Sequence, residues 1–269
     1  MSKDKVSIII TTKNESKNIR RCLLSCQKQD YKNIEIILID NFSTDKTVEI
    51  AKKFTKKVFQ KGHERSQQRN FGASLSSGKY LLFLDADMEI GKDCLLKALG
   101  EIKKGKFIVA FSEISTGKNF WEKSIALERN LYQKEQLLAA ARLFPKELFS
   151  KIGGFDEKLI AGEDWDLSIR AQRLGYKLIF NSEPIIHHEN VKNLKEILKK
   201  KRYYVKNIIF YVQKHPEEFA QQSSLKNRLG IYFKNWRRLS SQPFLTFGFL
   251  LLKAFIWLDC IKKNYGKFD

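Results

Sequence analysis

The segment Tyr80–Asp87 constrains this chain most, because it has the sequence of a buried strand that ends in two carboxylates. An uninterrupted apolar run precedes Asp85, as in strands that are covered on both faces. In open α/β sheets, ligands bind at the carboxyl ends of the strands. Two carboxylates this close resist joint ionisation unless a divalent cation neutralises them, and their hard oxygen atoms suit Mg²⁺ or Mn²⁺. An Asp-x-Asp pair also commonly caps a turn, so the neighbouring motifs must decide between these interpretations.

Strand and helix patterns alternate through the first part of the chain, which predicts an α/β fold with a largely parallel sheet covered by helices. The 269 residues, 43% of them hydrophobic, suffice for one catalytic domain and an appendage. The predicted strands are Val6–Thr12, Glu35–Asp40, a short one near Val58, Tyr80–Leu84, Phe107–Ser112 and a later one at Pro184–Ile186. The predicted helices are Lys17–Gln29, Asp45–Phe54, Arg65–Leu75, Lys92–Lys103, Lys118–Leu138 and one from Gly162 to near Gly175.

Polar side chains follow three of the predicted strands. Thr11–Glu15 ends the first strand, Asp40 ends the second, and the carboxylate pair ends the fourth. A carboxylate such as Asp40 can accept hydrogen bonds from a base N–H or a ribose hydroxyl. Alternatively, Asp40 and Glu15 cap the helices that follow them. Three polar strand ends at one edge favour a nucleotide site.

Several motifs together resemble the family 2 glycosyltransferases, which have the GT-A fold, a Rossmann-like, mostly parallel sheet flanked by helices. The motifs are Val6–Glu15, Ile36–Asp45, Gln68–Gly72, Leu84–Asp87, Gly153–Asp156 and Gly162–Leu167. They lie within residues 5–190, about 70% of the chain. The resemblance implies a nucleotide-sugar-dependent transferase that inverts the sugar's configuration.

The resemblance also assigns roles to single residues on the donor side. The positions that it assigns to the donor nucleotide are Thr11, Glu15, Asp40, Arg69, Asn70 and Asp85. It further implies that Asp85 and Asp87 bind a metal ion, Mn²⁺ or Mg²⁺, which bridges the donor diphosphate. The histidine of related enzymes at the later strand suggests His187 as a further metal ligand, with His188 as the alternative. Only one of the two should face the site, because side chains alternate along a strand, and an imidazole ligand favours manganese.

The acceptor side needs a general base, since a sugar diphosphate departs while an acceptor hydroxyl loses its proton on the opposite face. Asp164 is the candidate, in a Glu-Asp motif that opens a predicted helix. The helix N-terminus stabilises carboxylates there but also lowers their pKa, which weakens a base. The other residues assigned to the acceptor side are Gly154, Phe155, Asp156, Glu163 and Trp165. The alternatives are that Glu163 satisfies the helix N-terminus and that the Gly153–Gly154 pair is an ordinary helix C-cap.

The C-terminal part of the chain is basic and rich in aromatic residues. The chain carries a formal net charge of +20, and residues 192–269 contribute 17 Lys/Arg against 5 Asp/Glu, or +12. A basic amphipathic stretch at Lys195–Val212 and an apolar run at Phe244–Leu252 suit a membrane interface. Extended to Ile261, the apolar run would measure about 27 Å as a helix with two charges inside, so an interfacial anchor is preferred to a span. A core-packed helix or a dimer contact is the alternative.

These patterns predict a catalytic domain at residues 1–191 and a helical, membrane-associating tail at 192–269. Apolar aromatics dominate the tail, which argues against nucleic acid as its partner. The start of the chain lacks the pattern of a secretory signal, and Cys22, Cys26, Cys94 and Cys260 show no paired metal spacing. We therefore expect reduced, packed cysteines and a protein at the inner face of the cell membrane.

The predicted acceptor is a hydroxyl of a saccharide or of a lipid-linked glycan, as in the synthesis of cell-envelope glycans. A polyprenyl phosphate is the alternative acceptor, but its anionic oxygen would not need Asp164 as a base. A basic membrane-binding scaffold with a decayed site is the non-enzyme alternative. The donor sugar, its base and the oligomeric state have no signature in the sequence.

Overall fold

The computed structural model describes residues 4–191 and 193–262, and the chain divides into two compact units. The first unit comprises Met1–Ser112 and Ala139–Ile186, and the second comprises Glu113–Leu138 and His187–Asp269. Residues 113–138 thus group with the C-terminal helices, and the domain boundary after residue 191 stays a prediction. Cys260 lies in the last helix, but its side chain is outside the described part.

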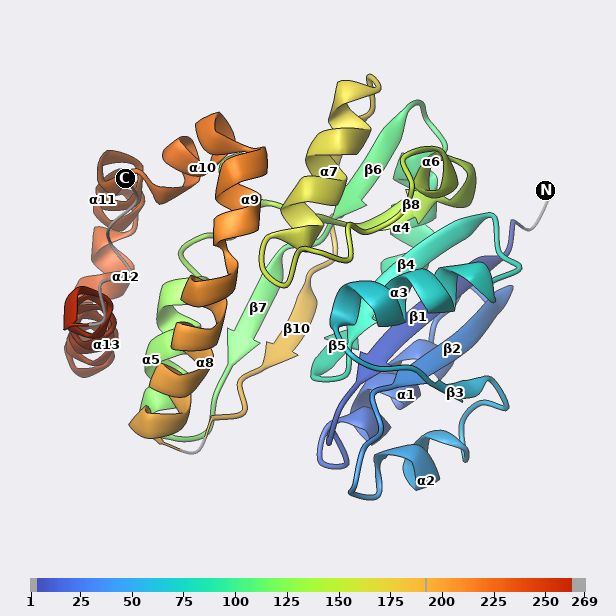
Figure 1. Cartoon of the computed structure of the whole chain (residues 1–269), viewed down its shortest axis with the longest axis horizontal. Helices are drawn as coiled ribbons and strands as arrows, with labels where there is room; N and C mark the ends of the chain where they lie inside the picture. The colour runs from blue at the N-terminus through green and yellow to red at the C-terminus, as the bar shows by residue number, and fades with distance from the viewer. Residues whose placement is uncertain (1–3, 192, 263–269) are drawn as a thin grey trace. The chain divides into compact units, whose positions relative to one another are not determined.

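The first unit is the α/β part that the sequence predicted. Its elements are β1 (Val6–Thr12), α1 (Ile19–Gln27), β2 (Ile34–Asp40), α2 (Thr47–Ala51), β3 (Val58–Gln60), α3 (Arg65–Ser74), β4 (Tyr80–Asp85), β5 (Met88–Ile90), α4 (Cys94–Ile102), β6 (Phe107–Ala110), β8 (Ala141–Pro145), α6 (Lys146–Lys151), α7 (Glu163–Arg173) and β9 (Lys177–Phe180). Strand β10 (Ile185–His188) contains the boundary between the units. Helices cover both faces of the sheet (Figure 1).

The seven-stranded sheet has the order β3-β2-β1-β4-β8-β6-β9. It is parallel except at β8, which runs antiparallel to both of its neighbours. Thr12 lies opposite Asp40, and Thr11 lies opposite Asp85. The predicted strand ends therefore meet at one edge of the sheet, on either side of β1, as the alternation of strands and helices required.

Side chains of β1 alternate between two apolar clusters, because successive residues of a strand point to opposite faces. Ile8 and Ile10 pack with residues of α1 and α4, whereas Ile9 packs with residues of α3, α6 and α7. All seven residues of β1 are buried, as expected for a central parallel strand. A Cβ atom at Gly72 would lie 2.6 Å from Cγ2 of Ile9, so glycine lets α3 approach the sheet closely.

One predicted helix end was wrong, and one strand was missed. The helix predicted to reach Leu138 ends at Arg129, because the side chain of Asn130 accepts from the Ser115 N–H at 2.8 Å and donates to the Ser115 carbonyl at 2.9 Å. Strand β8 was not predicted although it lies inside the sheet. Its sequence, with an arginine, a proline and no β-branched residue, lacks the usual strand signal.

The second unit is mainly helical. Its elements are β7 (Glu113–Thr116), α5 (Phe120–Arg129), the 3₁₀ helix η1 (Gln136–Leu138), α8 (Leu194–Asn207), α9 (Ile209–Lys214), α10 (Pro216–Ser223), α11 (Leu225–Lys234), α12 (Trp236–Ser240) and α13 (Pro243–Lys262). Helix α5 begins with a capping box, in which Asn119 accepts from the Glu122 N–H. Leu127 of α5, Leu239 of α12 and Phe249 of α13 share one apolar cluster. Within residues 4–191 and 193–262, no helix combines the length and hydropathy needed to cross a membrane.

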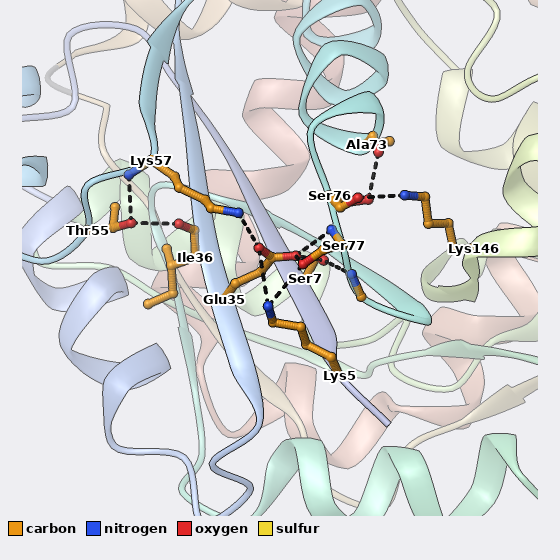
Figure 2. A network of polar contacts seen from close by, with 11 residues as sticks. Lys5, Ser7, Glu35, Ile36, Thr55, Lys57, Ala73, Ser76, Ser77 and Lys146 are labelled. Carbon is orange, nitrogen blue, oxygen red and sulfur yellow. Dashed lines mark hydrogen bonds and ion pairs between the residues drawn. The ribbon is translucent and has the colours of Figure 1, made fainter. Parts of the chain in front are cut away.

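Glu35 anchors the amino-terminal edge of the sheet, opposite to the edge with the aspartates (Figure 2). Its carboxylate accepts hydrogen bonds from the Ser7 hydroxyl of β1, from the Ser77 N–H before β4 at 2.6 Å and from the Lys57 ammonium before β3. Burial raises the pKa of Glu35, but these hydrogen bonds outweigh burial and lower the pKa to about 2. One carboxylate thereby ties three strands to β2.

We expect Glu35→Gln to lower the free energy of unfolding at pH 7 by about 2 kcal/mol, because the amide loses the bond from the ammonium and mismatches the other donors. A depressed carboxyl pKa stabilises the fold above about pH 4.5 and ceases to do so as pH falls through about 2. The difference between parent and variant should therefore shrink across that window in urea unfolding. Glu49→Gln, at an exposed side chain, is the control, and a constant difference at all pH values would contradict this role.

Candidate active site

The loops after β1 and β2 are tied together at the carboxyl edge of the sheet. Asp40 is fully buried and accepts from the Thr12 hydroxyl at 2.8 Å and from the N–H and hydroxyl of Ser43 at 2.7 and 2.6 Å. Asn14, at a positive φ of 55°, accepts from the Thr44 N–H at 2.8 Å. Asp40 thus shapes this loop through its own hydrogen bonds, and its contact with a nucleotide stays a prediction.

Glu15 lies where the first loop enters α1. Its N–H donates to the Thr47 hydroxyl at 2.8 Å, and its carbonyl accepts from the Ile19 N–H at 2.9 Å. Its carboxylate accepts from the Asn18 amide at 2.9 Å. The N-cap of α1 is Asn18 and no described side chain caps the helix, so the alternative that Glu15 caps α1 is wrong. The role of Glu15 toward a nucleotide stays a prediction. Thr11 is buried in β1 with the Asp85 backbone opposite it.

A buried guanidinium joins the end of β4 to the start of α7. Nη2 of Arg69 lies 2.8 Å from Oδ1 of Asp85, and its Nη1 lies 3.0 Å from Oε1 of Glu163. The Arg69 side chain is 3% exposed and stacks over the Phe155 ring at 5.2 Å. Arg69 therefore brings the predicted donor side and the predicted acceptor side into one ion-pair network.

The charges of this network shift the two carboxyl groups in opposite directions. Burial raises the pKa of Asp85, but the guanidinium groups of Arg69, Arg142 and Arg65 outweigh burial and hold it well below its usual range. Burial and the neighbouring Asp164 carboxylate raise the pKa of Glu163, against the two arginines that contact it. Asp85 is therefore ionised at neutral pH and available as an anionic ligand.

The Gly153–Asp156 segment is held by Asn70 of α3. The Asn70 side chain donates to the Phe155 carbonyl and accepts from the Phe155 N–H, both at 2.9 Å. A Cβ atom on Gly154, whose φ is 69°, would lie 2.7 Å from the Asn70 oxygen, so this contact needs glycine. Asn70 thus positions this loop, and the donor-side role that the resemblance gives it stays a prediction.

The same segment also ends α6, as the C-cap alternative proposed. The Gly154 N–H donates to the Phe149 carbonyl at 2.9 Å, and the Asp156 side chain accepts from the Lys158 N–H at 3.1 Å. Phe155 is 4% exposed within an apolar cluster. The loop therefore has a structural role beside the site, and its contacts with an acceptor stay a prediction.

Helix α7 carries the candidate base at its first turn. Asp164 is half-buried, and its Oδ1 accepts from the Trp165 N–H at 2.9 Å. The Ser168 hydroxyl donates to the Asp164 carbonyl at 2.8 Å and accepts from the Ala141 N–H at 2.9 Å. This bridge fixes the first turn of α7 to β8, so the backbone that bears Asp164 is held at the edge next to the Arg69 network.

Sequence reasoning missed two polar residues at this edge. Nη1 of Arg142, on β8, lies 3.4 Å from Oδ2 of Asp85. The Gln68 amide donates to the Ile39 carbonyl at 2.7 Å and so fastens α3 to β2. Gln68 precedes the Arg-Asn pair in the recognised motif, which could have indicated it, whereas Arg142 had no signal because its strand was not predicted.

The predicted metal ligands fall in different units. Asp87 lies two residues beyond Asp85, at a half-buried position in the first unit, whereas His187 belongs to the second. Nη1 of Arg129 lies 2.5 Å from Nδ1 of His187. An arginine only donates, so Nδ1 must accept and the proton must lie on Nε2. In this arrangement neither ring nitrogen offers a lone pair, and a metal role for His187 stays a prediction, as it does for His188.

We expect Arg69→Met to lower the free energy of unfolding at pH 7 by about 3–5 kcal/mol, because the buried Glu163 and the partly buried Asp85 lose their shared guanidinium. Without Arg69 the pKa of both carboxyl groups rises, so protonation at lower pH removes the uncompensated negative charge. The difference in free energy of unfolding between parent and variant should therefore narrow as pH falls towards 5. Arg65→Met is the matched control, since Arg65 is half-exposed and lies 3.5 Å from Glu163. Equal losses in both variants would contradict a special role for Arg69.

Comparison with known proteins places the chain in a family. Residues 7–155 match the model of Glycosyl transferase family 2. The chain is 28% identical over 206 residues to Glycosyltransferase GlyA of Streptococcus pneumoniae serotype 4, a match that covers 66% of this chain but 29% of GlyA. It is 27% identical over 210 residues to Amylovoran biosynthesis glycosyltransferase AmsB of Erwinia amylovora, covering 69% of each.

A solved structure shows the same fold. The mannosyltransferase PcManGT from Pyrobaculum calidifontis, solved in complex with GDP-Man and Mn²⁺, superposes with a TM-score of 0.60 at 16% identity and covers 98% of this chain and 88% of that one. The sheet of this chain, with its carboxylates at the end of β4, is thus a GT-A-like sheet. Because the family model spans more than half of the sequence, the chain belongs to glycosyl transferase family 2 and is a glycosyltransferase.

Proposed function

We propose that this nucleotide-sugar-dependent glycosyltransferase transfers a sugar, with inversion, to a hydroxyl of a saccharide or lipid-linked glycan at the inner face of the cell membrane. The observation that carries the proposal is the contact of Arg69 with both Asp85 and Glu163. Through this one guanidinium, the ionised carboxylate of Asp85 on the donor side is linked to the turn that bears Asp164.

The donor side is supported by the carboxyl edge of the sheet. Thr11 and Asp40 end adjacent parallel strands, and the loops beyond them are fixed by hydrogen bonds between Asn14, Ser43 and Thr44. Such a crevice on either side of the central strand is where open α/β sheets bind nucleotides. PcManGT, which has the same fold, was solved with a nucleotide sugar, GDP-Man, and this supports a nucleotide sugar as the donor.

The carboxylates of Asp85 and Asp87 fit a divalent cation, Mn²⁺ or Mg²⁺. Within the described ranges, no three His, Cys, Asp or Glu side chains gather closely enough to hold a metal ion by themselves. Two carboxylates suffice for a cation that takes its remaining ligands from phosphate oxygens and water, as Mg²⁺ often does. Bound there, the cation would supply Lewis-acid stabilisation of the charge on the departing diphosphate.

Asp164 is the proposed general base. Its carboxylate lies at the start of α7. The Ser168 bridge to β8 holds the backbone carbonyl of Asp164 and so restricts the movement of the backbone there. The half-buried position allows contact with an acceptor hydroxyl while its neighbours Glu163 and Asp166 are buried. Asp166 is paired with Arg170 at 2.7 Å and so has a structural role. Asp164 is thus the carboxylate of this turn best placed to accept a proton.

We expect one of UDP, GDP, dTDP or CMP to raise the thermal midpoint of unfolding in the presence of Mn²⁺, because ligand at a hundred times its Kd stabilises by about 2.7 kcal/mol. The shift should be lost in Asp87→Asn, which weakens the pair of carboxylates. Glu89→Gln, two residues further on, is the control and should keep it. If none of the four nucleotides shifts the midpoint with Mn²⁺ or Mg²⁺, the metal-assisted donor site is wrong.

We expect Asp164→Asn to lower kcat by about 10²–10⁴-fold while KM for the donor changes little, since the amide cannot take the acceptor proton. The measurement is release of the free nucleotide from the donor class identified above, with acceptor extracts present. Asp30→Asn, at the amino-terminal edge of the sheet after α1, is the control. Unchanged kcat in Asp164→Asn would exclude it as the base and favour an acceptor that is already anionic.

A further inference from the structure

Helix α13 of the second unit is apolar on two opposite faces. One face packs inside the unit, where Phe249 is 1% and Leu252 4% exposed. The opposite face bears large apolar side chains with 36–83% exposure: Phe244, Phe247, Leu250, Phe255, Trp257 and Leu258. A surface helix of a globular protein normally turns polar side chains outward, so a helix that is apolar all round implies a second apolar environment.

The one charged residue within 244–258 does not interrupt this outward face. Lys253 directs its ammonium to Glu128 of α5, with 2.6 Å between Nζ and Oε1. The Tyr132 hydroxyl donates to the same carboxylate at 2.9 Å. Burial raises the pKa of Glu128, but the Lys253 ammonium beside it outweighs burial and lowers the pKa below its usual value. The Glu128 side chain is 14% exposed and the Lys253 side chain 38%, so the lysine is partly exposed while its ammonium is directed to α5.

The two preceding helices add an exposed stripe of the same character. Leu225, Leu229, Phe233 and Trp236 recur every three or four residues along α11 and into α12, and each is at least 45% exposed. Helices α11 and α12 share the apolar cluster of α13 through Ile231, Tyr232 and Leu239 (Figure 1). Three exposed cations lie between and after these aromatics: Lys234, whose ammonium pairs with Glu135 at 3.3 Å, Arg238, whose guanidinium donates to the Asn130 carbonyl at 3.2 Å, and Arg237.

We propose that the outward face of α13, together with the stripe on α11 and α12, docks on an anionic lipid bilayer; we call this surface the docking face. Aromatic and apolar side chains next to Lys and Arg are the chemistry that the headgroup region of an anionic membrane accepts. At 20 residues α13 is about 30 Å long, and it lies on the bilayer because its inner face is already packed on α5.

Charge decides between a bilayer and a second copy of this chain as the occupant. A two-fold contact through the docking face would bring Lys234, Arg237 and Arg238 near the same residues of the partner. The part of the chain that bears this face carries +12 over residues 192–269, so a self-contact would be opposed by like charges. Anionic headgroups neutralise the same cations. This inference rests on the membrane placement in the proposed function and names the surface that makes the contact, but it does not depend on sugar transfer.

Flotation of the whole chain with lipid vesicles tests the docking face. We expect binding to vesicles of phosphatidylcholine with about 30% phosphatidylglycerol, at least tenfold weaker binding to phosphatidylcholine alone, and a marked decrease when salt is raised from about 0.1 to 0.5 M. Phe247→Glu should weaken binding by about tenfold or more, because it places a charge where an aromatic ring leaves water. Arg237→Glu with Arg238→Glu should remove the preference for anionic vesicles.

Leu96→Glu is the matched control, since Leu96 is 53% exposed on α4 of the first unit, and its vesicle binding should equal that of the parent. Circular dichroism and thermal unfolding verify that each variant is folded. Quenching of tryptophan fluorescence by brominated lipid should fall in Trp236→Phe with Trp257→Phe. Absence of vesicle binding overturns the proposal, and a dimer in light scattering that Phe247→Glu dissociates would identify a second copy as the occupant instead.

Discussion

The candidate site depends on the ion pairs of Arg69. A guanidinium that is 3% exposed would be strongly unfavourable without partners, and its partners come from the end of β4 and from the start of α7. The pairing is therefore reciprocal: the carboxylates compensate the buried cation, and the cation keeps Asp85 ionised where a donor diphosphate and its metal ion would need it. Loss of any one partner leaves an uncompensated charge in the interior.

The two edges of the sheet use buried carboxylates for different purposes. At the amino-terminal edge, Glu35 has all of its hydrogen bonds supplied by protein groups and joins strands into one unit. At the carboxyl edge, Asp85 ends β4, Asp87 lies in the short connection to β5, and both are partly accessible. A satisfied carboxylate stabilises a fold, whereas arginines hold Asp85 ionised at a position that is still partly accessible.

The central strands and the edge at which they end could be predicted because the information is local. Buried parallel strands have runs of apolar residues, and Thr11, Asp40 and Asp85 follow those runs directly. Contacts between residues that are far apart in the sequence have no such local signal. Arg69 and Glu163 are 94 residues apart, and the end of α5 is set by the bonds of Asn130 to Ser115 rather than by any breaker in the sequence. Arg142 was missed for the same reason, since β8 depends on its place between β4 and β6.

The apolar run of α13 shows why a sequence pattern alone could not distinguish a span, an interfacial helix and a core helix. Each of the three requires apolar residues, and only the direction of Lys253 separates them. In a span, a lysine in the middle of the run would lie in hydrocarbon. Here its ammonium is directed to Glu128 of α5, and Phe249 and Leu252 are buried, so one side of α13 makes protein contacts and the side opposite is left apolar. These contacts give a helix of nearly uniform hydropathy two distinct faces, of which the outward one has no partner within its own unit among the described residues.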